Sequence, residues 1–189
     1  GREHRAVLAR PKAFYTPSPL FPYLGVRGEV GLMAQEAQVD WDLRALQEIF
    51  SAALDEGLLK RRPDVRMRVD GSPTVEITYI KSKVFIWYDR THDIYLAAAE
   101  PLLERDGADG SCPMRFRVNG YGNTAREAIE GLRRKVRELA REVEAISGWV
   151  KDALDVEGSI AADAARDAID ATLASIHDLM DALKVKKEG

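Results

Sequence analysis

The sequence predicts an α+β protein in which an antiparallel sheet of about five strands packs against a helix, with further helices at the N-terminal and C-terminal sides. Three observations lead to this class. Five strand-like runs follow one another between residues 65 and 118, and polar, glycine-containing segments separate most of them. A long amphipathic segment follows the last run, and apolar residues recur at helical spacing before the first run and near the C-terminus.

Composition places the chain among ordinary globular proteins. The 189 residues are 46% hydrophobic and 31% charged, with a formal net charge of −3. The single cysteine, Cys112, cannot form an internal disulfide, which suits a cytoplasmic location. We see no apolar run of membrane-spanning length and no signal peptide, so no membrane partner is expected.

Residues 1–37 form the first predicted unit, an extended arm. Four of the eight prolines lie here with four aromatic residues between them, and proline favours extended backbone. This arm either lies across the protein's own surface or docks onto a partner.

Residues 38–150 form the second predicted unit, which begins with a helix. Asp40 is a suitable N-cap, apolar residues follow at helical spacing, and Pro63 would end the helix near Arg62. The predicted strands then follow in chain order: Val65–Val69, Val75–Ile80, Val84–Tyr88, Ile94–Ala99 and Met114–Val118. The segments 70–73 and 89–93 carry the residue types of hairpin turns.

Two late helices complete the prediction. Gly120 and Gly122 are expected to make a tight strand-to-helix turn, and Thr124 and Glu127 form a capping box that opens a helix to about Ser147. Gly148 would stop that helix. Residues 151–189 form the third predicted unit, an acidic amphipathic helix with net charge −4, from five basic and nine acidic side chains.

The order of elements from Val84 to Ala140 resembles the core of the HicB-like antitoxin family, a three-stranded meander backed by one helix. The resemblance rests on the turn at 89–93, on Pro101 closing the next strand, and on the glycine pair before the capped helix. It implies a core that binds and occludes a small toxin ribonuclease. The helix and hairpin before Val84 are additions to that core.

The function expected from this reading is that of a non-enzymatic interaction module, which binds and inhibits or regulates a partner protein. If the protein is an antitoxin, its partner would be a toxin ribonuclease. If it is a phage or plasmid anti-defence inhibitor, its partner would be a nucleic-acid-handling defence protein. Five aspartates of the last helix fall within an arc of about 80° at 100° per residue. We call Asp163, Asp167, Asp170, Asp178 and Asp181 the acidic ridge. The ridge is either a solvated helix face or a partner-binding surface that imitates phosphates.

The alternative function is a nucleic-acid-binding regulator. Arg66 and Arg68 share one face of their strand, as do Arg115 and Arg117 of theirs. If both pairs lie on the same sheet face, they form a surface for nucleic acid or for an acidic partner.

The remaining expectations concern chemistry and assembly. An enzyme with an unrecognised carboxylate site is the last alternative, and no catalytic, cofactor-binding or metal-binding residue is assigned. Asp89, His92 and Asp93 are a weak ligand cluster that a polar turn explains equally well. The apolar stripes of the two late helices suit either a hairpin within one chain or a two-fold dimer.

Overall fold

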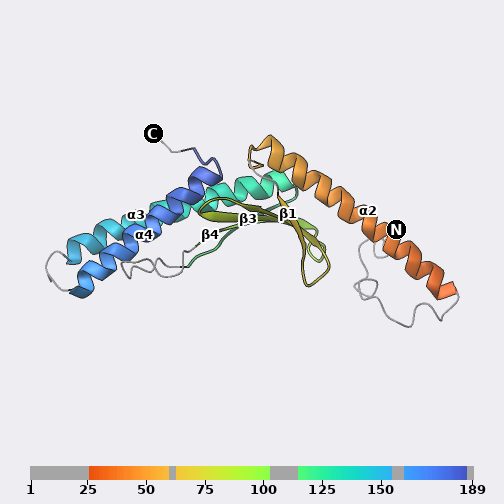
Figure 1. Cartoon of the computed structure of the whole chain (residues 1–189), viewed down its shortest axis with the longest axis horizontal. Helices are drawn as coiled ribbons and strands as arrows, with labels where there is room; N and C mark the ends of the chain where they lie inside the picture. The colour runs from red at the N-terminus through yellow and green to blue at the C-terminus, as the bar shows by residue number, and fades with distance from the viewer. Residues whose placement is uncertain (1–25, 60–62, 103–114, 155–159, 187–189) are drawn as a thin grey trace.

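A computed structural model describes residues 26–59, 63–102, 115–154 and 160–186, and Figure 1 shows one sheet with three helices on one side of it. The predicted α+β class is confirmed. The elements are α2 (Val26–Asp55), β1 (Asp64–Met67), β2 (Pro73–Thr78), β3 (Ser82–Asp89), β4 (Ile94–Pro101), β5 (Val118–Gly122), α3 (Ala125–Leu154) and α4 (Ile160–Ala182). The acidic segment expected between the fourth and fifth strands lies mostly outside the described residues, as do residues 1–25 of the expected arm.

The five strands form an antiparallel meander in which spatial order equals chain order. Each strand except the two at the edges is paired on both sides, and β3 and β4 are paired over eight residues. β1 begins one residue and ends two residues earlier than predicted, and β2 lies two residues earlier. Pro73 can begin β2 because a missing N–H costs little at the first position of a strand.

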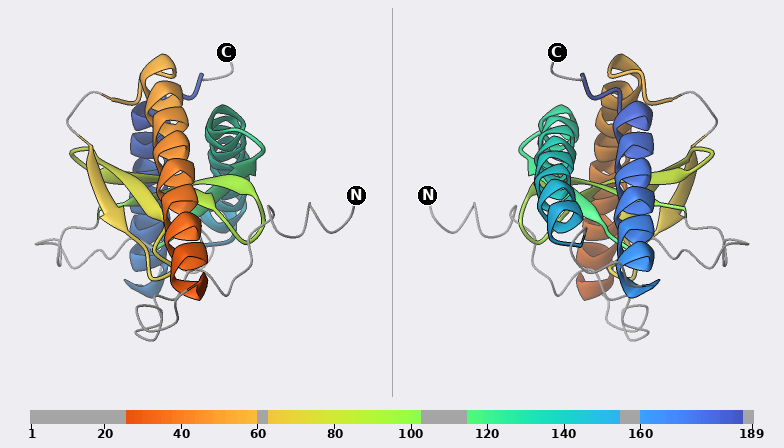
Figure 2. Two further views of the ribbon diagram at one scale, coloured as in Figure 1. Left: turned by 90° about the vertical axis from the view of Figure 1, so that its right-hand side faces the viewer. Right: turned by 90° about the vertical axis from the view of Figure 1, so that its left-hand side faces the viewer.

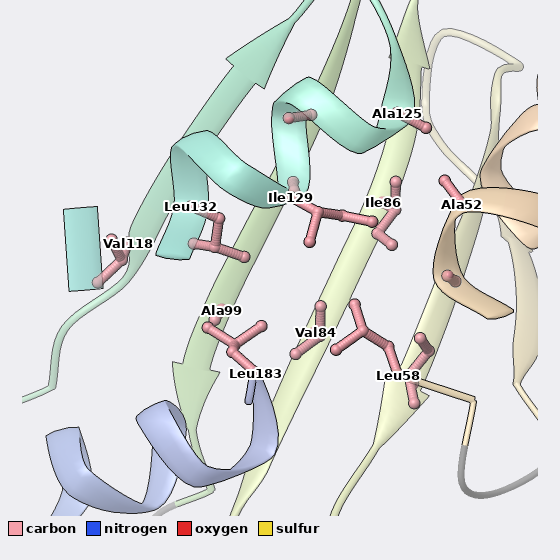
Figure 3. Close-up of a cluster of buried hydrophobic side chains, with 14 of the residues drawn as sticks. Ala52, Leu58, Val84, Ile86, Ala99, Val118, Ala125, Ile129, Leu132 and Leu183 are labelled. Atoms are coloured by element: carbon pink, nitrogen blue, oxygen red, sulfur yellow. The ribbon is translucent and has the colours of Figure 1, made fainter. Parts of the chain in front are cut away.

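Alternation along the strands separates two faces of this sheet. Val84, Ile86 and Tyr88 of β3 lie opposite Ala99, Ala97 and Tyr95 of β4, and all six are buried. Over them pack Ile129 and Leu132 of α3, the C-terminal half of α2 and the end of α4, as Figure 3 shows. The core therefore lies between this face and the helices.

Helix α2 begins at Val26, so residues 26–37, which we expected in the arm, are helical. No proline follows Pro22 in this part of the chain, and nothing therefore interrupts the helix before Asp40. The helix ends at Asp55 rather than near Arg62. Gly57 has a φ of +70°, and the amide of Leu58 donates to the carbonyl of Ala53, which is a glycine-terminated Schellman end.

Gly120 and Gly122 belong to strand β5, so the prediction that they form a turn is wrong. Their role is close approach to α3, since a Cβ on Gly120 would lie 2.1 Å from the backbone nitrogen of Leu132. The fifth predicted strand, Met114–Val118, shares only Val118 with β5, so the prediction ended where the strand begins.

Half of the capping box predicted for α3 is confirmed, because the Glu127 amide donates to Thr124 Oγ1 at 3.1 Å. The Glu127 carboxylate accepts from the Asn123 amide at 2.7 Å rather than from the Thr124 amide. The helix passes Gly148 and continues to Leu154, because a helical glycine only weakens a helix unless a left-handed residue ends it. α4 lies alongside α3, and the pair extends beyond one end of the sheet while α2 extends beyond the other (Figure 1). None of the described helices is both long and apolar enough to span a bilayer.

Two buried arginines tie the helices together. Arg133 of α3 donates to the Leu183 carbonyl at 2.8 Å, to the Glu56 carboxylate at 2.7 Å and to the Glu56 carbonyl at 3.2 Å. It thus joins α3 to the ends of α2 and α4. Arg90 forms an ion pair with Asp42 of α2 and donates to the Gly71 carbonyl at 3.2 Å. Arg133 therefore holds the three helices to one another, and Arg90 holds α2 to two turns of the sheet.

Candidate ligand-binding face of the sheet

The second face of the sheet is covered by none of the described helices, and we call it the helix-free face. One row of this face crosses all five strands, because the register places Arg66, Thr74, Trp87, Leu96 and Tyr121 side by side. The next row runs through Asp64, Glu76, Phe85, Ala98 and Asn119. These rows combine charged, polar and aromatic side chains with the apolar residues Leu96 and Ala98, of which Ala98 is fully buried.

Two arginines reach the middle of the helix-free face from opposite edges. The guanidinium carbon of Arg68, next to β1, lies 4.3 Å from the centre of the Trp87 ring. That of Arg117, next to β5, lies 5.2 Å from the Phe85 ring and 5.8 Å from Trp87. Cations within about 6 Å of a ring centroid are attracted by the ring's quadrupole. The arginines are therefore held over the aromatic pair of β3.

A buried carboxylate organises the other cations. Glu76 is only 4% exposed, and its oxygens lie 2.8 Å from Arg66 Nε and 2.9 Å from Lys83 Nζ. A buried charge needs such partners, so the two cations are positioned by the sheet itself. The carboxylate of Glu100 lies 4.0 Å from Arg117 at the β5 side.

Arg115 contacts none of the described aromatic rings. It is exposed and lines a pocket of about 250 Å³ together with Glu100, Pro101, Leu102 and Phe116. Of the four predicted arginines, the structure thus brings Arg66, Arg68 and Arg117 to the charged and aromatic residues of one face, whereas Arg115 contributes to the wall of this pocket.

The sequence prediction did not assign a role to the aromatic residues of this site. Trp87 and Phe85 alternate with Val84 and Ile86, so period-two alternation was a signal that they lie on the face opposite the core. Tyr121 was placed in a turn, but it lies on β5 and is 70% exposed. It adds an accessible ring to the row of Trp87.

The acidic ridge lies on α4 opposite the buried residues Thr172, Ile176 and Leu179. Three of its five carboxylates have cationic partners within the protein. Asp163 pairs with Arg166 at 3.1 Å, Asp170 with Lys151 at 2.9 Å, and Asp178 with Lys81 at 3.8 Å. These are exposed pairs, which contribute little stability. Asp167 and Asp181 are exposed and form no ion pair with any other described residue.

The residues of the β3–β4 turn separate into two local interactions. Asp89 accepts from the Thr91 amide at 2.8 Å and contacts His92 Nδ1 at 2.6 Å, whereas Asp93 bonds to the Tyr88 hydroxyl. Burial alone would raise the pKa of Asp89, but the hydrogen bonds from His92 and from the turn amides lower it. Within the described ranges, no group of three or more acidic, histidine or cysteine side chains is arranged to hold a metal ion.

Comparisons of the chain with protein-family models, with curated proteins and with solved structures find no match to any of them. The resemblance to HicB-like antitoxins therefore stays a prediction from the sequence, and function has to be argued from the site.

Proposed function

We propose that the protein is a non-enzymatic binding module that takes single-stranded nucleic acid on the helix-free face of its sheet. The observation that carries the proposal is the placement of Arg68 and Arg117 over the rings of Trp87 and Phe85. This placement supports the alternative function predicted from the sequence, which is that of a nucleic-acid-binding regulator.

The chemistry of this face matches what single strands offer. Bases present flat π-faces that stack on aromatic rings or on guanidinium planes, and phosphates accept hydrogen bonds from arginine and lysine. Trp87 is only 7% exposed beneath the arginines, so a base would stack on the outer side of a guanidinium or on the exposed ring of Tyr121. The N–H groups at the edge of each guanidinium would then face the phosphates.

A single strand fits this face better than a duplex. Base faces are accessible only where bases are unpaired, and the described part of the face carries aromatic rings rather than a helix that could enter a groove. Because Glu76 and Glu100 neutralise part of the positive charge, we expect stacking to supply much of the affinity and the salt dependence to be modest.

Fluorescence anisotropy with labelled 12-nucleotide DNA and RNA single strands and with the matching duplex tests the proposal. We expect saturable binding of the single strands, and at least about tenfold weaker binding by the Arg68→Gln/Arg117→Gln variant, from a stacking contribution of about 1–3 kcal/mol per base. Arg134→Gln, on the exposed side of α3, is the matched control and should bind like the parent. Absence of saturable binding, or equal loss in both variants, would overturn the proposal.

A protein partner is the second candidate, and the acidic ridge favours it. The five carboxylates lie on the outer side of α4, where a basic groove of a toxin ribonuclease or a defence protein would meet them. Affinity capture from the host lysate, compared with the Asp→Asn variant of all five positions, tests this. A captured nucleic-acid-binding protein that is lost in the variant and released by added nucleic acid supports it, and capture that the variant preserves contradicts it.

A further inference from the structure

Strand β1 is an edge strand whose outward backbone groups belong to Val65 and Met67. The amide of Arg68 donates to the Ser72 carbonyl at 2.8 Å, and the Arg68 carbonyl accepts from the Gly71 amide at 2.9 Å, so Arg68 bonds toward β2. Because hydrogen-bonding direction alternates along a strand, Arg66 also bonds toward β2, whereas Val65 and Met67 direct their N–H and C=O groups away from the sheet. The edge thus offers a row of backbone donors and acceptors.

The apolar side chains of this edge lack a cover within the described chain. Val65 and Met67 point to the helix side of the sheet, yet they are 48% and 67% exposed, because α2 packs over β2 and β3. Figure 2 shows β1 at the outer side of the sheet, with α2 between β1 and α3.

Exposed apolar side chains also occur on α2. Leu43 and Leu54 are 54% and 65% exposed, and their separation of 11 residues puts them on the same side of the helix. Glu48 and Asp55 contact α3 from another side of α2, so the two leucines face away from α3. We call the exposed pair Val65 and Met67 on the helix side of β1 the β1 shelf.

We propose that two copies of the chain pair through their β1 strands, antiparallel about a two-fold axis, and form a continuous ten-stranded sheet. The β1 shelves of the two copies then meet on the helix side, and the exposed apolar side chains cover one another. Strand pairing of this kind satisfies outward backbone groups that are otherwise left to water.

The charges of β1 favour a second copy of the chain as the partner of this edge. Asp64 lies directly opposite Glu76, and Asp64 forms no ion pair with any other described residue, whereas Glu76 has two cations. Pairing centred on Val65 places each Asp64 opposite Arg66 of the other copy. Shifting the centre by one residue either way brings like charges together, Asp64 against Asp64 or Arg66 against Arg66.

This interface is independent of the proposed nucleic-acid binding, but it would join the two helix-free faces side by side. Arg66 and Arg68 of both copies would then lie at the centre of one extended face. A strand bound there would cross from one copy to the other.

Sedimentation velocity over a range of protein concentrations, with the full chain, tests the pairing. We expect a concentration-dependent dimer, and its loss in Val65→Pro, because proline removes an outward N–H that the monomer does not use. Val65→Thr keeps that N–H and the branched side chain, and it should keep the dimer. Circular dichroism and the thermal midpoint show whether Val65→Pro is folded.

Charge reversal gives a second, independent measurement. Asp64→Arg, at an exposed position, should weaken dimerisation at least about tenfold, because it sets an arginine opposite Arg66 of the other copy in the Val65-centred register. A parent chain that is still monomeric at about 200 µM in sedimentation velocity, where a weak dimer would be populated, overturns the proposal. A folded Val65→Pro variant that dimerises like the parent overturns it equally.

Discussion

The two faces of one sheet make opposite use of the same five strands. On the helix-covered face, Val84, Ile86 and Ala97 are fully buried, and Gly120 lies where no side chain fits. On the helix-free face, positions one residue along carry arginine, glutamate and aromatic rings, which hold one another by ion pairs and cation–π contacts. Close packing holds the first face. On the second, polar and cation–π contacts predominate, although Glu76, Trp87 and Ala98 are buried there as well.

The largest difference between the faces should appear at neighbouring positions of β5. Gly120→Ala puts a Cβ into the backbone of α3, so we expect a loss of about 3 kcal/mol or more in the free energy of unfolding. Asn119→Ala, on the helix-free face, should change it by less than about 0.5 kcal/mol. Urea denaturation measures both, and equal effects would contradict the division into a packed and an open face.

A buried ion network secures the covered side. Arg133→Met removes a donor from the carbonyls of Leu183 and Glu56 and from the carboxylates of Glu56 and Glu130, so we expect a loss of about 3 kcal/mol. Burial alone would lower the pKa of Arg133, but its bonds to Glu56 and Glu130 raise it, so the group stays charged. Arg134→Met, exposed on the same helix, should be nearly neutral in the same urea measurement. An Arg133→Met variant with an unchanged free energy of unfolding would show that the network does not hold the helices together.

The covered face was the part that the sequence predicted best. Alternating strands, turn residues at 70–73 and 89–93, and the capping box at Thr124 are local signals, and the structure contains the corresponding elements. Errors arose where a tertiary contact decides the outcome. Gly120 and Gly122 look like turn residues in the sequence, and only the position of α3 shows that they make room for a helix.

The candidate site was predicted in part for the same reason. Alternation paired Arg66 with Arg68 and Arg115 with Arg117, but only the register of the full meander brings β1 and β5 to opposite sides of Trp87. Ion pairs between distant segments, such as that of Asp178 with Lys81, likewise depend on the packing of α4. Sequence spacing carries no information on either.

A smaller, pH-dependent effect should come from Tyr79, whose hydroxyl donates to the Leu58 carbonyl at 2.6 Å. Burial raises the pKa of Tyr79 from an ordinary value of 10 to about 12. Because the folded state has the higher pKa, the contribution of the neutral phenol is complete below pH 10 and is lost as the pH rises toward 12.

We therefore expect Tyr79→Phe to cost about 1–2 kcal/mol at neutral pH, through the unpaired carbonyl. The difference from the parent should stay constant up to pH 10 and shrink above it. Urea titrations at pH 7, 9, 10 and 11 measure this, and a difference that grows with pH would contradict the assignment.

The smallest effect on stability should come from the residues that carry the proposed function. Arg68→Gln/Arg117→Gln removes cation–π contacts at exposed positions, which are worth about 0.5–1 kcal/mol each at most. The free energy of unfolding should fall by about 1–2 kcal/mol in sum at most, while anisotropy reports loss of single-strand binding. Substitutions on the helix-free face would then change binding with little change in stability, which substitutions on the helix-covered face cannot do. A loss of several kcal/mol in the free energy of unfolding would contradict this expectation. The rings of Trp87 and Phe85 would then belong to the core, and the arginines would serve folding rather than ligand binding.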